Sequence, residues 1–148
     1  MAPVTRIEAR IDTADVSGAG TDGFVYVGLI GREFHLNTSA DDFERASART
    51  YVLGAGANVY YPAQNDPRRP QLDTNDLTEF PVYVRLERAG NHHEWALDRV
   101  VVTVNPGQPS EARFDFPAIA GAASVWLGNR FGKIVYLKQV TSGPPSPG

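Results

Sequence analysis

Cysteine is absent from the 148-residue sequence. This absence excludes disulfide-stabilised scaffolds, thiol nucleophiles and cysteine-rich zinc sites. It leaves the cellular compartment open, because cysteine-free domains occur on both sides of membranes.

A basic surplus is also missing, since 14 lysines and arginines face 17 aspartates and glutamates, for a formal net charge of -3. Proteins that bind nucleic acid normally carry excess positive charge, so we expect no nucleic-acid partner. No apolar run approaches the length that spans a bilayer, so we expect no transmembrane segment. The first ten residues, MAPVTRIEAR, contain no apolar core of a secretory signal, so none is expected in the chain as given.

Common catalytic motifs are absent: there is no Gly-x-Ser-x-Gly elbow, no His-Glu-x-x-His pair and no phosphate-binding loop. An enzymatic function therefore has no positive support from motifs. The chain has three histidines, His35, His92 and His93. Neighbouring residues on a strand point to opposite faces, so His92 and His93 do not suit one metal ion. A transition-metal centre that combines His35, one of this pair and Glu94 is not favoured by the spacing, and we expect solvated loop histidines.

Helical periodicity is scarce, whereas an alternation of apolar and polar residues dominates. Only SADDFERASAR, residues 39–49, predicts a helical turn or two, with Ser39 or Asp41 as its N-cap. In residues 5–12, Ile7, Ala9 and Ile11 alternate with charged residues, as expected for a half-buried strand. The same reasoning predicts eight strands, within residues 5–12, 24–31, 48–54, 80–90, 95–105, 112–119, 123–129 and 133–140. Short strands separated by turn residues predict an all-β sandwich or barrel.

The length fits one domain, which we assign to residues 1–140. Residues 141–148, rich in proline, glycine and serine, are predicted to form a tail or linker. Residues 54–76 are long for a connection without structure, so they form either a functional loop or a further strand. Within them, Tyr60, Tyr61, Arg68 and Arg69 are candidates for contact with a membrane or protein partner. The alternative is a strand at NVYY with one tyrosine packed inward.

The order of several motifs resembles that of the PLAT (lipoxygenase-homology) domain over about residues 4–139. A Gly-Thr-Asp at 20–22 precedes a strand, an Asp-Asp-Phe-Glu-Arg block lies at 41–45, and a Trp-x-Leu-Asp-Arg-Val opens a strand at 95–100. The sequence VWLGN follows at 125–129. Two departures from the family pattern are the long segment 54–76 and the histidine pair before Trp95.

This resemblance implies an all-β, eight-stranded antiparallel β-sandwich of two four-stranded sheets, without a catalytic centre of its own. It also implies a module that docks on lipid, on a membrane surface or on a protein partner, often with calcium. The candidate calcium ligands come from two loops: Gly18, Gly20 and Asp22 in the first, and Asn37, Asp41, Asp42 and Glu44 in the second. Calcium takes six to eight oxygen ligands of these kinds. The alternative is that these residues form turns and caps, or that Asp42 or Glu44 pairs with Arg45.

Four further residues in predicted strands have expected roles. We expect Trp95 to lie in the core, and Trp126 is either a core residue or a membrane anchor. Asp98 is expected to tie down a neighbouring loop through hydrogen bonds, and Arg99 to pair with an acid.

The leading hypothesis is a non-catalytic docking module, peripheral at membranes, that uses calcium to approach anionic headgroups. The alternative is a small standalone enzyme or small-molecule-binding protein that uses the sandwich as a scaffold. An aromatic-lined pocket with two or more titratable groups favours the alternative. A third possibility is a spacer that positions a neighbouring domain.

Overall fold

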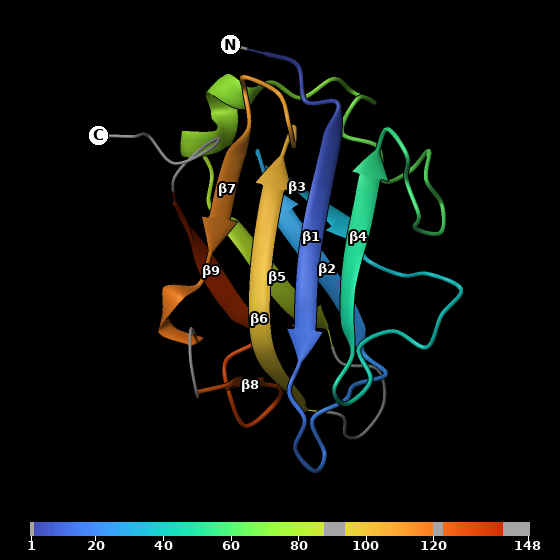
Figure 1. Ribbon diagram of the computed structural model, residues 1–148, viewed down its shortest axis with the longest axis vertical. Helices are drawn as coiled ribbons and strands as arrows, with labels where there is room; N and C mark the ends of the chain where they lie inside the picture. The colour runs from blue at the N-terminus through green and yellow to red at the C-terminus, as the bar shows by residue number, and fades with distance from the viewer. Residues whose placement is uncertain (1, 88–93, 120–122, 141–148) are drawn as a thin grey trace.

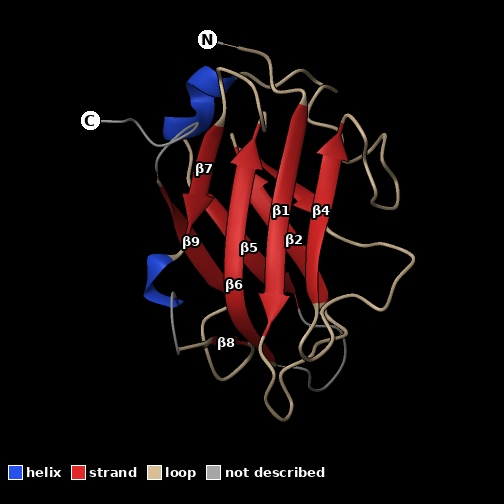
Figure 2. Cartoon of the chain, viewed as in Figure 1, coloured by secondary structure: helices blue, strands red, loops and turns tan. Residues whose placement is uncertain are grey.

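The computed structural model describes residues 2–87, 94–119 and 123–140 and shows an all-β protein with two short 3-10 helices (Figure 2). Its elements, in chain order, are β1 (Arg6–Thr13), β2 (Phe24–Leu29), β3 (Arg32–His35), β4 (Ala48–Gly54), η1 (Thr74–Thr78), β5 (Val82–Glu87), β6 (Trp95–Val104), β7 (Ala112–Asp115), η2 (Pro117–Ile119), β8 (Val125–Leu127) and β9 (Ile134–Gln139). His92, His93 and the predicted tail 141–148 lie outside the described residues.

Eight strands form two packed layers, with β7, β6, β1 and β4 in front of β9, β5, β2 and β3 (Figure 1). All strand pairs are antiparallel. The predicted fold class is confirmed. Two details differ from the prediction. The structure has nine strands, because β3 was not predicted, and β8, within the predicted strand 123–129, pairs with β6 outside the two layers; two residue pairs between β7 and β9 also join the layers into one curled sheet.

The core is built from the inward-facing positions that the alternation predicted. Ile7, Ala9 and Ile11 of β1 and Val82, Val84 and Leu86 of β5 are buried, together with alternate residues of β2 and β6. Trp95 is fully buried, as expected, and its indole N–H donates to the hydroxyl of Thr13 at 2.9 Å.

The eight strands predicted from alternation omit β3, which has only four residues, Arg32–His35. The short helix predicted within residues 39–49 is wrong, because residues 39–47 form bends and turns and residues 48–49 begin β4. Phe43 and Ala46 adopt positive φ values of 60° and 64°, which interrupt a right-handed helix. Phe43 is held in the core by stacking on Tyr51, at 5.0 Å between ring centroids.

The long segment 54–76 covers the two edges at which the curled sheet ends, β4 and β3. Asn58 accepts from the Val52 N–H and donates to the Thr50 carbonyl of β4. Asn65 accepts from the N–H of His35 in β3. Uncovered edges invite pairing with other chains, so this segment protects the sheet. It contains no strand between 55 and 67 in the described chain, and Tyr60 and Tyr61 are exposed, which rules out the NVYY strand.

The guanidinium of Arg32 fixes the same segment by donating to three backbone carbonyls, those of Gln64, Asp66 and Arg69. No helix in the described residues is both long and apolar enough to cross a bilayer.

Candidate metal centre

Three carboxylates from two loops meet at one end of the sandwich. Asp22 lies in the β1–β2 loop, and Asp41 and Glu44 lie in the β3–β4 loop. One oxygen from each lies within 4.8 Å of the others. Asp22 and Asp41 are exposed and Glu44 is half-buried. Three like charges this close repel one another, and a cation between them relieves that repulsion.

A glycine permits the two loops to approach this closely. A Cβ atom on Gly20 would lie 2.9 Å from the backbone nitrogen of Arg45 and 3.3 Å from the Cα of Glu44. One residue further, the Thr21 N–H donates to the Phe43 carbonyl at 3.1 Å. The backbone contact at Gly20 therefore sets the distance between Asp22 and its partners in the second loop.

Gly18 has a different requirement. Its φ of 76° is in the left-handed region, and a Cβ there would meet no atom within 4 Å. The backbone conformation, and not close packing, favours glycine at this position.

The other predicted ligands lie around the same three carboxylates. Asn37 lines a cavity of about 180 Å³ together with Asp22, Asp41 and Asp42. Gly18 and Gly20 line a second cavity, of about 290 Å³, with Asp22 and Glu44. The seven candidates thus lie at one end of the fold.

Both carboxylate oxygens of Asp42 accept hydrogen bonds. One accepts from the Thr38 N–H at 2.7 Å, and the other accepts from the Thr38 hydroxyl at 2.7 Å and the Tyr51 hydroxyl at 3.1 Å. Burial, followed by the charge of Asp42, raises the pKa of Tyr51 well above its usual range. Tyr51 therefore remains a neutral donor to this carboxylate. Arg45, the pairing partner considered for Asp42 and Glu44, forms an ion pair with Asp15 at 2.9 Å.

His35 is half-buried on β3 and not a solvated loop residue, which corrects the prediction for this histidine. Its ring stacks on Tyr26 at 5.1 Å and meets the edge of Phe24 at 5.4 Å. Burial lowers the pKa of His35 below its ordinary value, although the charges of Asp42 and Glu87 oppose this shift. The ring is therefore neutral at pH 7 and adds no positive charge beside the carboxylates.

Several partly exposed apolar side chains lie in or beside the β1–β2 loop, and Phe24 lines one cavity with Asp22 and Asp41. Val16 and Phe24 are 45% and 43% exposed. On the other side of the Gly18–Gly20 loop, Trp126 and Phe131 line a cavity of about 390 Å³, with ring centroids 6.2 Å apart. Trp126 is half-buried, so neither a role in the core nor a role as a membrane anchor describes its whole side chain. Val16, Phe24 and Phe131 were not recognised in the sequence, although an aromatic residue inside the turn sequence Gly-Asn-Arg-Phe-Gly is an available signal.

The candidate contact residues of the segment 54–76 fall into two groups. Tyr60 and Tyr61 are 47% and 66% exposed, and the Tyr60 N–H donates to the Asn37 carbonyl. Arg68 and Arg69 both form ion pairs with Asp66, at 2.9 and 3.7 Å. The tyrosines therefore lie beside the second acidic loop, whereas the arginines are engaged within their own segment.

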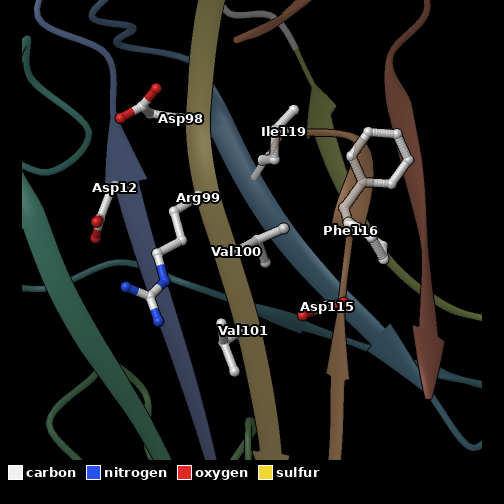
Figure 3. A pocket seen from close by; sticks show the side chains of 9 residues that line it. Asp12, Asp98, Arg99, Val100, Val101, Asp115, Phe116 and Ile119 are labelled. Carbon is white, nitrogen blue, oxygen red and sulfur yellow. The ribbon is translucent and has the colours of Figure 1, made fainter. Parts of the chain in front are cut away.

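A further cavity lies on the outer surface of the front layer, shares no lining residue with the two cavities around the carboxylates, and contains Asp98 and Arg99 (Figure 3). Asp98 accepts a hydrogen bond from the Ser124 hydroxyl at 3.1 Å, as expected for a residue that ties down a loop. Arg99 forms no ion pair with any acid in the described residues, so its predicted pairing is wrong within that part of the chain.

Comparison of the sequence with models of known families gives no match, and comparison with curated proteins gives none either. The structure, in contrast, matches solved structures over almost its whole length. It is similar to alpha toxin from Clostridium absonum, with a TM-score of 0.61 and 24% identity over 92% of this chain. Clostridium perfringens alpha-toxin gives a TM-score of 0.62 with 17% identity over 93%. Coral 8R-lipoxygenase, described as activated by calcium through a C2-like domain, gives 0.57 with 18% identity over 90%.

These similarities show that the chain has the PLAT fold, as the sequence resemblance implied. The chain spans 32% of each toxin and 17% of the coral lipoxygenase. At these identities the likeness concerns the fold and not the activity of those longer proteins.

Proposed function

We propose that this PLAT-fold chain is a non-catalytic docking module that binds a membrane surface through calcium held by Asp22, Asp41 and Glu44. The observation that carries this proposal is the meeting of three carboxylate oxygens within 4.8 Å, next to exposed apolar side chains. Their donor set is suited to a hard cation, because calcium prefers oxygen ligands in flexible geometry.

The three carboxylates supply fewer oxygens than calcium requires. Backbone carbonyls of the two loops, the Asn37 amide and water are available to complete the coordination. Lipid headgroup oxygens are ligands of the same kind, so a headgroup can complete the coordination of an ion held between the loops. Without the ion, the acidic end and an anionic surface repel each other.

Val16, Phe24 and Phe131 supply the apolar part of this contact. They are between 43% and 45% exposed and lie around the same loops. Burial of such side chains at the boundary between headgroups and acyl chains is favourable, and it complements the charge interaction through the ion. Tyr61 beside the second loop is a further candidate for interfacial contact, because tyrosine has an apolar ring with a polar tip.

Flotation with vesicles of phosphatidylserine and phosphatidylcholine tests the proposal. We expect the wild-type protein to float with the vesicles in calcium and to stay in the dense bottom fraction of the gradient in chelator. Asp41→Asn should abolish flotation in calcium, and Phe131→Ser should weaken it while calcium binding in solution is retained. Asp76→Asn is the matched control, because Asp76 is an exposed acid in η1, at the opposite end of the sandwich (Figure 1).

A protein partner is the other class of target for the same surface. The wild-type protein could bind calcium in solution and yet fail to float with vesicles of any charge. This result would contradict membrane docking and favour a protein partner. Calorimetric titration that detects no calcium binding would contradict the metal site itself. Tyr61→Ser separates the contribution of the segment 54–76, since Tyr61 lies outside the carboxylate group.

A further inference from the structure

The cavity of about 390 Å³ beside the acidic loops combines aromatic rings with charge. It shares Gly18 and Gly20 with the cavity that contains Asp22 and Glu44. Its other described lining residues are the aromatic Trp126 and Phe131 and the charged Glu94 and Arg130. β8 carries Trp126 and lies at the same end of the fold as the β1–β2 loop (Figure 1). The volume falls within the range of small-molecule sites, and rings with a few polar groups are typical of such sites.

The indole ring of Trp126 is held in place from one side. Trp126 lies opposite Ala96 in the β6–β8 pair, and it packs against the buried Ala14, Ala19 and Ala96. Since Trp126 is half-buried, the rest of its surface is available to the cavity. A ring that packing already orders loses little conformational entropy when a ligand binds.

The second ring comes from the tight turn between β8 and β9. The Phe131 N–H donates to the Gly128 carbonyl, and the Gly128 N–H donates to the Gly132 carbonyl, each at 3.2 Å. The Phe131 ring is 45% exposed, and its centroid lies 6.2 Å from that of Trp126 with 25° between the ring planes. Aromatic faces carry partial negative charge and attract cations, and tryptophan does so most strongly.

The two charged residues meet at the same place. Arg130 donates to both carboxylate oxygens of Glu94, from Nη2 at 2.7 Å and from Nε at 3.3 Å. The Glu94 side chain lies against Gly128, where a Cβ atom would be 2.6 Å from its Cγ. The Arg130 side chain is 80% exposed, and its Nη1 has no acceptor among the residues that the structure describes. The cavity therefore has no net charge from this pair, but retains guanidinium donors that face solvent.

These features favour a zwitterion over a ligand with one charge. A simple anion that reaches Arg130 also meets the Glu94 carboxylate, and a simple cation also meets the Arg130 guanidinium. A quaternary ammonium has an apolar surface, so it binds to aromatic rings beside a carboxylate. A phosphate attached to it accepts from the outer donors of an arginine. Phosphocholine contains both groups.

We propose that this cavity binds the phosphocholine headgroup of a membrane lipid. The quaternary ammonium lies against the rings of Trp126 and Phe131, beside Glu94. The phosphate accepts hydrogen bonds from Arg130. This inference rests on the proposed membrane function and adds a headgroup preference to it. Because docking holds the cavity among many headgroups, a weak affinity for each one is sufficient.

Titration of the whole chain with phosphocholine in chelator tests the site without membrane or ion. The chain has two tryptophans and Trp95 is fully buried, so a change in tryptophan emission reports on Trp126. Phosphoethanolamine lacks the three methyl groups and should bind about ten-fold or more weakly. Choline lacks the phosphate and should bind roughly two- to five-fold more weakly, because the contact with Arg130 is exposed.

Two variants assign the contacts. Arg130→Gln should remove the preference for phosphocholine over choline, which a purely structural role of Arg130 would leave unchanged. Phe131→Leu keeps an apolar side chain but removes the ring, and should weaken phosphocholine by about two- to five-fold. Arg113→Gln and Phe80→Leu are the matched controls. Arg113 is exposed and pairs with Glu111, Phe80 is 46% exposed, and neither lines this cavity.

Flotation in calcium relates the site to docking. Two sets of vesicles contain the same fraction of phosphatidylserine, and the remainder is either phosphatidylcholine or phosphatidylethanolamine, so both sets have the same net charge. We expect more of the wild-type protein to float with the phosphatidylcholine set. Arg130→Gln and Phe131→Leu should each reduce this difference between the two sets.

Two results would overturn the headgroup assignment. One is equal affinity of the wild-type protein for phosphocholine and phosphoethanolamine, or no response to phosphocholine at high millimolar concentration. The other is equal flotation with both vesicle sets, which would leave calcium-dependent docking intact. Absence of flotation with either set contradicts the proposed function instead. The comparison of headgroups uses only the wild-type protein, so it remains decisive if a variant fails to fold.

Discussion

Asp22 and Asp42 lie in the two acidic loops, yet the structure predicts opposite consequences for their replacement. In Asp42→Ala, the Thr38 N–H, the Thr38 hydroxyl and the Tyr51 hydroxyl all lose their acceptor. Thr38 is half-buried, so its donors can form hydrogen bonds with water. Tyr51 is buried, so its hydroxyl is left without an acceptor. A buried unsatisfied donor costs about 1–3 kcal/mol, and loss of the bonds to a charged acceptor adds to this cost.

We therefore expect Asp42→Ala to lower the free energy of unfolding by about 2–4 kcal/mol. For a chain of this length, each kcal/mol changes Tm by about 2–4 °C, which gives a decrease of about 5–15 °C. The decrease should be the same in calcium and in chelator, because it comes from hydrogen bonds and not from the ion.

Asp22→Asn should behave differently, since Asp22 is exposed and belongs to the three-carboxylate group. In chelator its Tm should stay within about 2 °C of the wild type or rise slightly, because one of three repelling charges is removed. At a free calcium concentration ten times the Kd, the ion stabilises the wild type by about 1.4 kcal/mol, or about 3–6 °C. Asp22→Asn should lose this rise, whereas Asp42→Ala should retain it from a lower starting temperature.

Thermal melts followed by circular dichroism, in calcium and then in chelator, measure the Tm of the wild type and of both variants and the rise in each Tm that calcium causes. An unchanged calcium rise in Asp22→Asn would refute the assignment of Asp22 as a ligand. A wild-type Tm for Asp42→Ala in chelator would refute the structural role of Asp42. Asp15→Asn serves as a control, because Asp15 is an exposed acid of the first loop that pairs with Arg45.

Three further substitutions have defined outcomes. Gly20→Ala should destabilise the fold by about 1–3 kcal/mol and weaken calcium binding in a titration, because its Cβ would lie 2.9 Å from a backbone atom of Arg45 and force the acidic loops apart. Arg32→Met should cost about 1–3 kcal/mol and speed proteolysis within 54–76, since three carbonyls of that segment lose their donor. Burial and the hydrogen bond to Glu33 raise the pKa of Tyr83 from 10.0 to about 12, so the folded state keeps this proton while the unfolded state releases it. Stability should therefore fall as pH rises between these values, and denaturant titrations should show a smaller fall in Tyr83→Phe.

The strands were predictable where a local pattern determines which side chains face the core. In β1 and β5 the alternation alone identified the buried positions. The helix predicted within residues 39–49 failed because contacts distant in sequence override local propensity. Phe43 packs on Tyr51 and on Trp95, whose ring lies 5.4 Å away at 68°, and this packing requires a backbone that is not helical.

The segment 54–76 shows a different limit of sequence reasoning. A functional loop and a missed strand were the alternatives, and the structure shows a cover over β3 and β4. Asn58 and Asn65 make this cover through side-chain hydrogen bonds to strand edges. Asparagine is common in ordinary turns, so its presence in the sequence does not reveal which edge it caps.

The sequence identified the two loops of the candidate site, but not which of their acidic residues meet and which is engaged by hydrogen bonds. The family resemblance placed Asp22, Asp41, Asp42 and Glu44 together, and the structure separates Asp42 by its hydrogen bonds. Tyr51, the buried donor to Asp42, lies nine residues away in a strand. Sequence spacing cannot distinguish a carboxylate that meets such a donor from one that faces solvent.

The arrangement of the Gly18–Gly20 loop links the ion to the apolar contact. One side of this loop lines the cavity with Asp22 and Glu44, and the other side lines the cavity with Trp126 and Phe131. An ion that fixes the loop on the acidic side also fixes one wall of the aromatic cavity. Coupling between two binding events is reciprocal, so in the proposed docking a membrane that engages Phe131 increases calcium affinity by the same factor by which calcium increases membrane affinity. The proposal therefore requires only an acidic site that is weak in solution, because the membrane itself would strengthen the binding of the ion.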